Sequence, residues 1–134
     1  MTDQIIGLGA VVNSQGQVLI DQRLENAFLG GFWEFPGGKQ KKGERIELTI
    51  AREIREELGI EVEVGKCLIN YEFDYGVKKL NFIVHICKHL SGDPTPYTSQ
   101  EVRWISFEQF DLYKFPPAND PIISALIEYL EKTK

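Results

Sequence analysis

The sequence predicts an α/β fold in which a mixed β-sheet lies between helices. Two observations predict it. Several short apolar or alternating segments are typical of strands, and two longer segments, one central and one C-terminal, carry an apolar stripe at helical spacing. At 134 residues and 43% hydrophobic content, the chain is long enough to bury a core. No repeat, linker or low-complexity tract interrupts it, so we expect a single domain over residues 1–134.

The first part of the chain is predicted to form a hairpin. Residues 5–12 are almost continuously apolar, which is typical of a central strand buried on both faces. After a turn that contains Gly16, residues 18–23 alternate as a second strand. Arg23 ends this strand, where it could be a surface charge or could hold a nucleotide phosphate in a bidentate grip.

An aromatic segment punctuated by glycines follows at residues 27–35. Trp33 and Phe35 are expected to lie in the core or in a pocket wall. Because side chains alternate along an extended chain, Glu34 should point the other way, toward a site.

The central helix is predicted over about residues 48–58. Its apolar side is expected to hold Leu48, Ile50, Ala51, Ile54 and Leu58, and its other side carries Glu53, Glu56 and Glu57. Like charges one turn apart destabilise a helix. Arg52 can pair with Glu56, but one guanidinium cannot neutralise three carboxylates. The cluster is therefore either a solvated acidic face or the site of a divalent cation.

Oxygen ligands indicate which cation the cluster would select. Hard carboxylate oxygens favour Mg²⁺, Mn²⁺ or Ca²⁺, whereas zinc prefers imidazole or thiolate, which this segment lacks. We expect Mg²⁺, with Mn²⁺ as the alternative. Mg²⁺ usually completes its shell with water and phosphate oxygens, so the substrate should be a phosphate ester or anhydride. Gly37, Gly38 and Gly43 leave the preceding loop room for close backbone approach.

Three further strands are predicted, at residues 67–74, 80–87 and 101–105. The first two are joined by a turn, and a loop rich in proline and glycine at 91–99 precedes the third. Glu101 stands where this loop meets the strand. It is interpreted either as a surface residue or as an additional metal ligand.

The C-terminal segment is predicted to contain a short helix at 107–111 and a longer final helix. Pro121 suits the first helical position and Asp120 the N-cap. If Asp120 caps the helix, the amide of Asn119 is free to face a ligand. The apolar stripe of the final helix is Ile122, Ile123, Leu126, Ile127 and Leu130.

Charge and hydropathy narrow the class of partner. A net charge of −5 argues against a polynucleotide as the main ligand. No apolar run is long enough to span a bilayer, and the N-terminal residues lack a basic stretch, so we expect a cytoplasmic protein without membrane contact. We further expect a monomer or a weak homodimer.

The spacing around the central helix matches a known motif. Gly38 is followed after five residues by Glu44 and after seven more by Arg52, and the pattern is completed by Glu53, Ile54, Glu56, Glu57, Gly59 and Ile60. The segment resembles the Nudix box at every specified position. This resemblance implies a Nudix hydrolase, with the α/β/α sandwich of that family, that hydrolyses a nucleoside diphosphate linked to another group.

Two further stretches, EFPGGK at residues 34–39 and FPPAN at 115–119, resemble the MutT branch of the family. The resemblance implies cleavage of 8-oxo-dGTP to 8-oxo-dGMP and pyrophosphate, with Asn119 on the base and Arg23 on the phosphates. Phe28 stands where this branch is expected to carry a polar residue. The remaining predicted substrate contacts are Phe28, Glu34, Phe35, Pro36, Gly37 and Gly38.

The same resemblance implies the metal ligands: the carbonyl of Gly37 and the carboxylate of Glu57, assisted by Glu56 and Glu53. For catalysis, we expect Glu53 to act as general base, Glu44 to support the ligands and Arg52 to orient the glutamates. Two alternatives stay open. One is a pyrophosphatase for another nucleotide, such as CTP or a dinucleotide. The other is a non-catalytic module that binds oxidised guanine.

Overall fold

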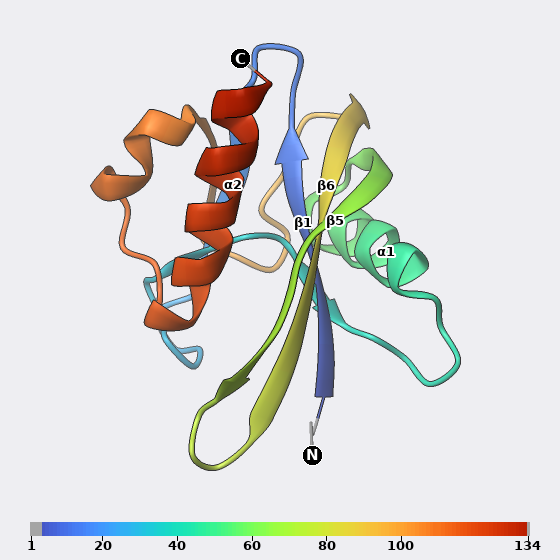
Figure 1. Cartoon of the computed structure of the whole chain (residues 1–134), viewed down its shortest axis with the longest axis vertical. Helices are drawn as coiled ribbons and strands as arrows, with labels where there is room; N and C mark the ends of the chain where they lie inside the picture. Colours follow the sequence, from blue (N-terminus) through green and yellow to red (C-terminus); the bar gives the residue numbers. More distant parts are fainter. Residues whose placement is uncertain (1–3, 134) are drawn as a thin grey trace.

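A computed structural model describes residues 4–133 as a seven-stranded mixed sheet between two helices (Figure 1). The central path of the sheet runs in the order β3-β2-β1-β6-β5. β1 (Gln4–Val12) runs parallel to β6 (Lys79–Ser91), and the other strand pairs are antiparallel. The predicted α/β fold with a mixed sheet is therefore confirmed.

The other strands attach on both sides of β1 and β6. They are β2 (Val18–Gln22), β3 (Trp33–Glu34), β4 (Gly37–Lys39), β5 (Glu61–Asp74) and β7 (Glu101–Ile105). β4 pairs with the first half of β1, while β3 and β7 both pair with β2. This arrangement brings the loop before the central helix next to β1.

α1 (Ile46–Leu58) covers one face of the sheet and buries Ile50, Ile54 and Leu58 completely (Figure 1). Close packing requires glycine in β1, because a Cβ at Gly9 would lie 2.6 Å from the Cδ1 atom of Ile54. The placement of Leu48 on the apolar side was wrong, since its side chain is 60% exposed. Leu48 stands about 200° around the helix from Ile50.

α2 (Asp120–Lys132) covers the other face, and two 3₁₀ helices precede it, η1 (Phe107–Leu112) and η2 (Pro117–Asn119). The prediction of Asp120 as N-cap was wrong. η2 runs directly into α2, which places Asn119 at the cap position and Asp120 inside the first turn. The side chain of Asn119 makes no capping hydrogen bond, so its amide is still free of that role.

The hairpin of β5 and β6 is longer than the sequence predicted. β5 begins at Glu61 rather than at residue 67, and β6 continues to Ser91. Register shifts between Val64 and Ile69 interrupt the alternation that identified the strand. Among the described residues, no helix has the length and apolar character needed to cross a membrane.

Candidate active site

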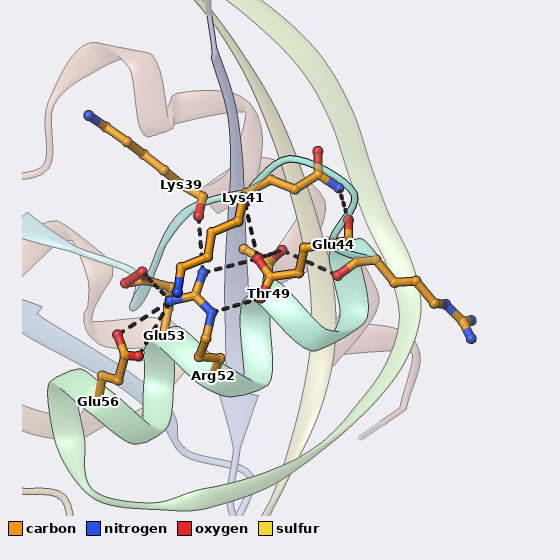
Figure 2. A network of polar contacts seen from close by, with 9 residues as sticks. Lys39, Lys41, Glu44, Thr49, Arg52, Glu53 and Glu56 are labelled. Atoms are coloured by element: carbon orange, nitrogen blue, oxygen red, sulfur yellow. Dashed lines mark hydrogen bonds and ion pairs between the residues drawn. The ribbon is translucent and has the colours of Figure 1, made fainter.

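Arg52 on α1 binds three glutamates at once (Figure 2). Its Nε and Nη2 atoms donate to the two carboxylate oxygens of Glu44, at 2.7 and 3.0 Å. Its Nη1 atom lies 3.1 Å from Glu53 and 3.3 Å from Glu56, and Nη2 also donates to the carbonyl of Lys39. The predicted orienting role of Arg52 thus corresponds to an observed network of contacts.

Glu44 is saturated by hydrogen-bond donors. Besides the guanidinium of Arg52, it accepts from the Thr49 hydroxyl at 2.7 Å and from the Lys41 N–H at 3.1 Å. These bonds, with Arg52 first, lower the pKa of the Glu44 carboxyl to about 2. Glu44 is therefore a fixed anion that anchors Arg52, which agrees with a supporting role.

Glu53 and Glu56 differ in exposure although both contact Arg52. The Glu53 side chain is 18% exposed and lies against β4, where a Cβ at Gly38 would stand 2.5 Å from its carboxylate. Glu56 is 57% exposed and can change its orientation freely. A side chain at position 38 would push the Glu53 carboxylate away from its present place against β4.

Glu57 lies behind these residues, against the backbone of Gly37. The Gly37 N–H donates to Glu57 at 3.2 Å. Burial is the main cause that raises the pKa of Glu57 to about 8, and repulsion from Glu34, Glu53 and Glu56 adds to it. Gly37 has a φ of 148°, and a Cβ there would stand 2.0 Å from the carbonyl oxygen of Gly7, so no other residue fits.

Sequence analysis missed Asp21 of β2. Its side chain is only 2% exposed, and it stands opposite Glu34 of β3 in the sheet register. Burial first, and then the charge of Glu34, raise its pKa well above the ordinary value, with Glu57 contributing. The available signal was an acidic residue that directly follows the apolar residues Val18, Leu19 and Ile20 in the same strand.

Arg23 and Glu34 meet at the end of β2, where the guanidinium and carboxylate are 2.8 Å apart. The Nε atom of Arg23 also donates to the carbonyl of Phe28 at 2.6 Å. The Phe28 ring is 67% exposed and packs edge-on against Tyr75, with centroids 6.0 Å apart. As predicted, Glu34 points away from the core, while its neighbour Trp33 is buried.

Three residues that were predicted to belong to the site do not lie with the glutamates of α1. Phe35 is 2% exposed and stacks on Phe115 in the core beneath α2. Pro36 is buried, and its carbonyl accepts from the Gly9 N–H. Glu101 pairs with Arg103 at 2.6 Å and shares its face of β7, the face on which Arg103 packs over Trp33.

The face of Glu101 is the one covered by α2, whereas the glutamates of α1 lie over the other. Val102, which points opposite to Glu101, packs in the core beneath α1. The structure therefore separates Glu101 from the proposed ligands, and the alternative interpretation as a surface residue fits its position.

Asn119 is 7% exposed at the start of α2. Its position is fixed by η2, because the Tyr71 hydroxyl of β5 donates to the neighbouring Ala118 carbonyl at 2.6 Å. The amide of Asn119 is therefore buried beside β5 and has no capping role.

The donor set suits a hard divalent cation. Carboxylate oxygens from α1 and the backbone of Gly37 face one another, and the buried Glu57 carboxyl has one backbone donor and no cationic partner among the described residues. In the arrangement of residues 4–133 described, no three acidic, His or Cys side chains already converge on one point.

Comparisons with known proteins agree with this geometry. Residues 7–125 match the family described as NUDIX domain. An 8-oxo-dGTP diphosphatase of Haemophilus influenzae is 33% identical over 122 residues, covering 91% of this chain and 90% of that protein. A CTP pyrophosphohydrolase of Escherichia coli is 28% identical over 120 residues, with 90% and 89% covered.

A solved structure extends the likeness to three dimensions. The MutT protein of Methanosarcina mazei superposes with a TM-score of 0.82 at 27% identity, covering 98% of this chain and 95% of that one. The family match over residues 7–125 includes the glycines of β4 and the glutamates of α1. The protein therefore belongs to the Nudix hydrolase family.

Proposed function

We propose that the protein is a Mg²⁺-dependent nucleoside triphosphate pyrophosphohydrolase that prefers 8-oxo-dGTP, releasing 8-oxo-dGMP and pyrophosphate. The observation that carries this proposal is the pairing of two features in one small domain: the oxygen cluster of α1 and β4, and the buried amide of Asn119. The likeness to an 8-oxo-dGTP diphosphatase over nine tenths of both chains supports the choice of substrate.

The metal would be held by Glu57, Glu56 and Glu53 together with the Gly37 carbonyl. A dication bound there supplies positive charge that polarises the phosphate oxygens and acidifies water. Mn²⁺ has the same preference for oxygen and could replace Mg²⁺. Arg52, anchored on Glu44, keeps Glu53 and Glu56 close to this position.

Glu53 is the proposed general base. Its carboxylate is largely sheltered, lies against the glycines of β4, and is oriented by Arg52 at 3.1 Å. A base in that position can take the proton of an attacking water while the anhydride bond breaks. Hydrolysis of the anhydride bond between the α- and β-phosphates yields the monophosphate and pyrophosphate.

Arg23 is the proposed phosphate ligand. Its ion pair with Glu34 at 2.8 Å holds the guanidinium at the end of β2. Because guanidinium binds phosphate with two parallel hydrogen bonds, a substrate phosphate can compete for it with the Glu34 carboxylate.

Asn119 accounts for base choice. Oxidised guanine carries N–H at N7, a donor, where guanine carries an acceptor. An amide that presents its oxygen to N7 therefore favours the oxidised base, since a buried mismatched polar pair costs about 1–3 kcal/mol. Because Asn119 is buried, no water replaces the missing hydrogen bond when the N7 position of the base does not match the amide.

A second candidate substrate is CTP, because the CTP pyrophosphohydrolase of E. coli matches the chain over a similar length. It would use the same metal and water and would differ only in the base pocket. A non-catalytic role is disfavoured because every acid of the motif is present.

Turnover of 8-oxo-dGTP, dGTP and CTP in Mg²⁺, with the products identified, tests the proposal. We expect 8-oxo-dGTP to give the highest kcat/KM and to yield a monophosphate and pyrophosphate. Asn119→Ala should lower kcat/KM for 8-oxo-dGTP by about tenfold or more and leave dGTP almost unchanged. A wild-type preference for CTP, or an equal loss on all three nucleotides, would contradict the substrate assignment.

A further inference from the structure

Asp21 occupies an unusual position for a charged residue. It lies in β2, a strand whose neighbours Leu19 and Ile20 are completely buried, and its own side chain is 2% exposed. Its side chain shares the face of Leu19, which packs beneath α1. Asp21 therefore points toward the helix that carries the glutamates.

Polar atoms around Asp21 are only partly satisfied by the protein. Among the described residues, Oδ1 of Asp21 and Oγ of Ser99 make no hydrogen bond of regular geometry, and the weaker contacts of the Asp21 carboxyl are with Ser99 and Glu34. Ser99 belongs to the loop before β7 and is itself 8% exposed. Two buried oxygens with incomplete hydrogen bonding beside a carboxylate cluster are atoms to which a bound cation or its water shell would contribute the missing interactions.

The surrounding charges are acidic. Asp21 interacts electrostatically with Glu34, its cross-strand partner, and with Glu57 of α1. The nearby guanidinium groups have other partners, since Arg23 pairs with Glu34 and Arg52 with Glu44. A buried acid beside other acids destabilises a fold unless something positive offsets it.

We propose that Asp21 is a positioning residue of the metal site, whose carboxylate acts through Glu57 to raise the affinity for a divalent cation. A dication at Glu57 gains attraction from both acids, whereas the metal-free protein holds two acids near each other without a counter-charge. This inference rests on the proposed metal-dependent function.

Mn²⁺ binding to the nucleotide-free protein provides the test. The free Mn²⁺ signal in electron paramagnetic resonance gives a Kd without turnover. Asp21→Asn keeps the size and removes the carboxylate, and we expect it to raise the Kd for Mn²⁺ about tenfold, the scale seen when a group supporting metal ligands is lost. The urea midpoint of the metal-free variant should stay equal or rise, an outcome opposite to that of a merely structural residue.

Two more variants complete the experiment. Asp111→Asn makes the same chemical change at an exposed position of η1 and should leave the Kd unchanged. Asp21→Ser is a smaller replacement that should weaken Mn²⁺ binding to a similar extent. If the wild type binds Mn²⁺ and Asp21→Asn binds it with the same Kd, the inference about Asp21 is overturned but the proposed function is not. Failure of both Asp21 variants to fold would also overturn the inference about Asp21. Absence of Mn²⁺ binding by the wild type would overturn the proposed function as well.

Discussion

Raising the pH should destabilise the metal-free protein, and Glu57 should be a principal cause. Its pKa is about 8 in the folded chain, whereas the ordinary value is 4.5. Between these values the folded state binds a proton that the unfolded state has released. The resulting stability is fully present below the unfolded pKa of 4.5 and is lost as the pH rises through the folded pKa of about 8.

The structure sets the size of this effect. Each unit of pKa difference corresponds to about 1.4 kcal/mol, so the shift of Glu57 represents a change on the order of a few kcal/mol in the free energy of unfolding. Asp21 is shifted in the same direction and adds to the slope. A change of this size is a large fraction of the stability of a domain of this length.

Urea unfolding in EDTA at several pH values between 5 and 8 would measure the slope. Glu57→Gln retains an oxygen that can accept from the Gly37 N–H but cannot titrate, so its stability should fall less with pH. Glu56→Gln is a matched control, because that side chain lies on the same helix and is 57% exposed. Equal slopes for the wild type and Glu57→Gln would refute the assignment.

Other substitutions test the remaining parts of the site. Glu53→Gln should lower kcat by at least about 10²-fold, the usual scale for loss of a general base, and a change below threefold would remove Glu53 from the chemistry. Arg52→Lys should lower kcat about 10-fold to 100-fold and weaken Mn²⁺ binding, because a point charge cannot span Glu44 and Glu53 together; an unchanged Mn²⁺ affinity would contradict this. Gly37→Ala should lower the free energy of unfolding in urea by at least about 1–3 kcal/mol, since its Cβ would stand 2.0 Å from the Gly7 carbonyl oxygen; wild-type stability would show that the backbone can shift.

The sequence was sufficient for features that depend on local periodicity. The stripe of Ile50, Ile54 and Leu58 predicted the buried face of α1, and the helix ends at Leu58 as predicted, followed by Gly59 with a φ of 70°. The supporting role expected of Glu44 and the orienting role expected of Arg52 stay predictions, and the structure joins the two residues by two hydrogen bonds.

Features that depend on strand pairing could not be predicted from the sequence. Whether Glu101 faces α1 or α2 depends on its register against β2, and a one-residue difference reverses the face. In the same way, the pairing of β2 with β3 determines that Asp21 stands opposite Glu34 rather than in solvent. The spacing of residues along the chain predicts neither the face of Glu101 nor the neighbour of Asp21.

The glutamates of one short segment also show how the fold divides roles among identical side chains. Glu44 accepts from a guanidinium, a hydroxyl and a backbone N–H, so it is ionised at low pH and has no capacity left for a metal. Glu57 has a single backbone donor and is buried, so its charged form is costly until a cation arrives. In the proposed site, this difference in pKa distinguishes Glu44, the proposed supporting residue, from Glu57, a proposed metal ligand. The Thr49 hydroxyl donates a hydrogen bond to Glu44. A hydrogen-bond donor introduced in the same way beside Glu57 should stabilise the metal-free protein and weaken its affinity for metal.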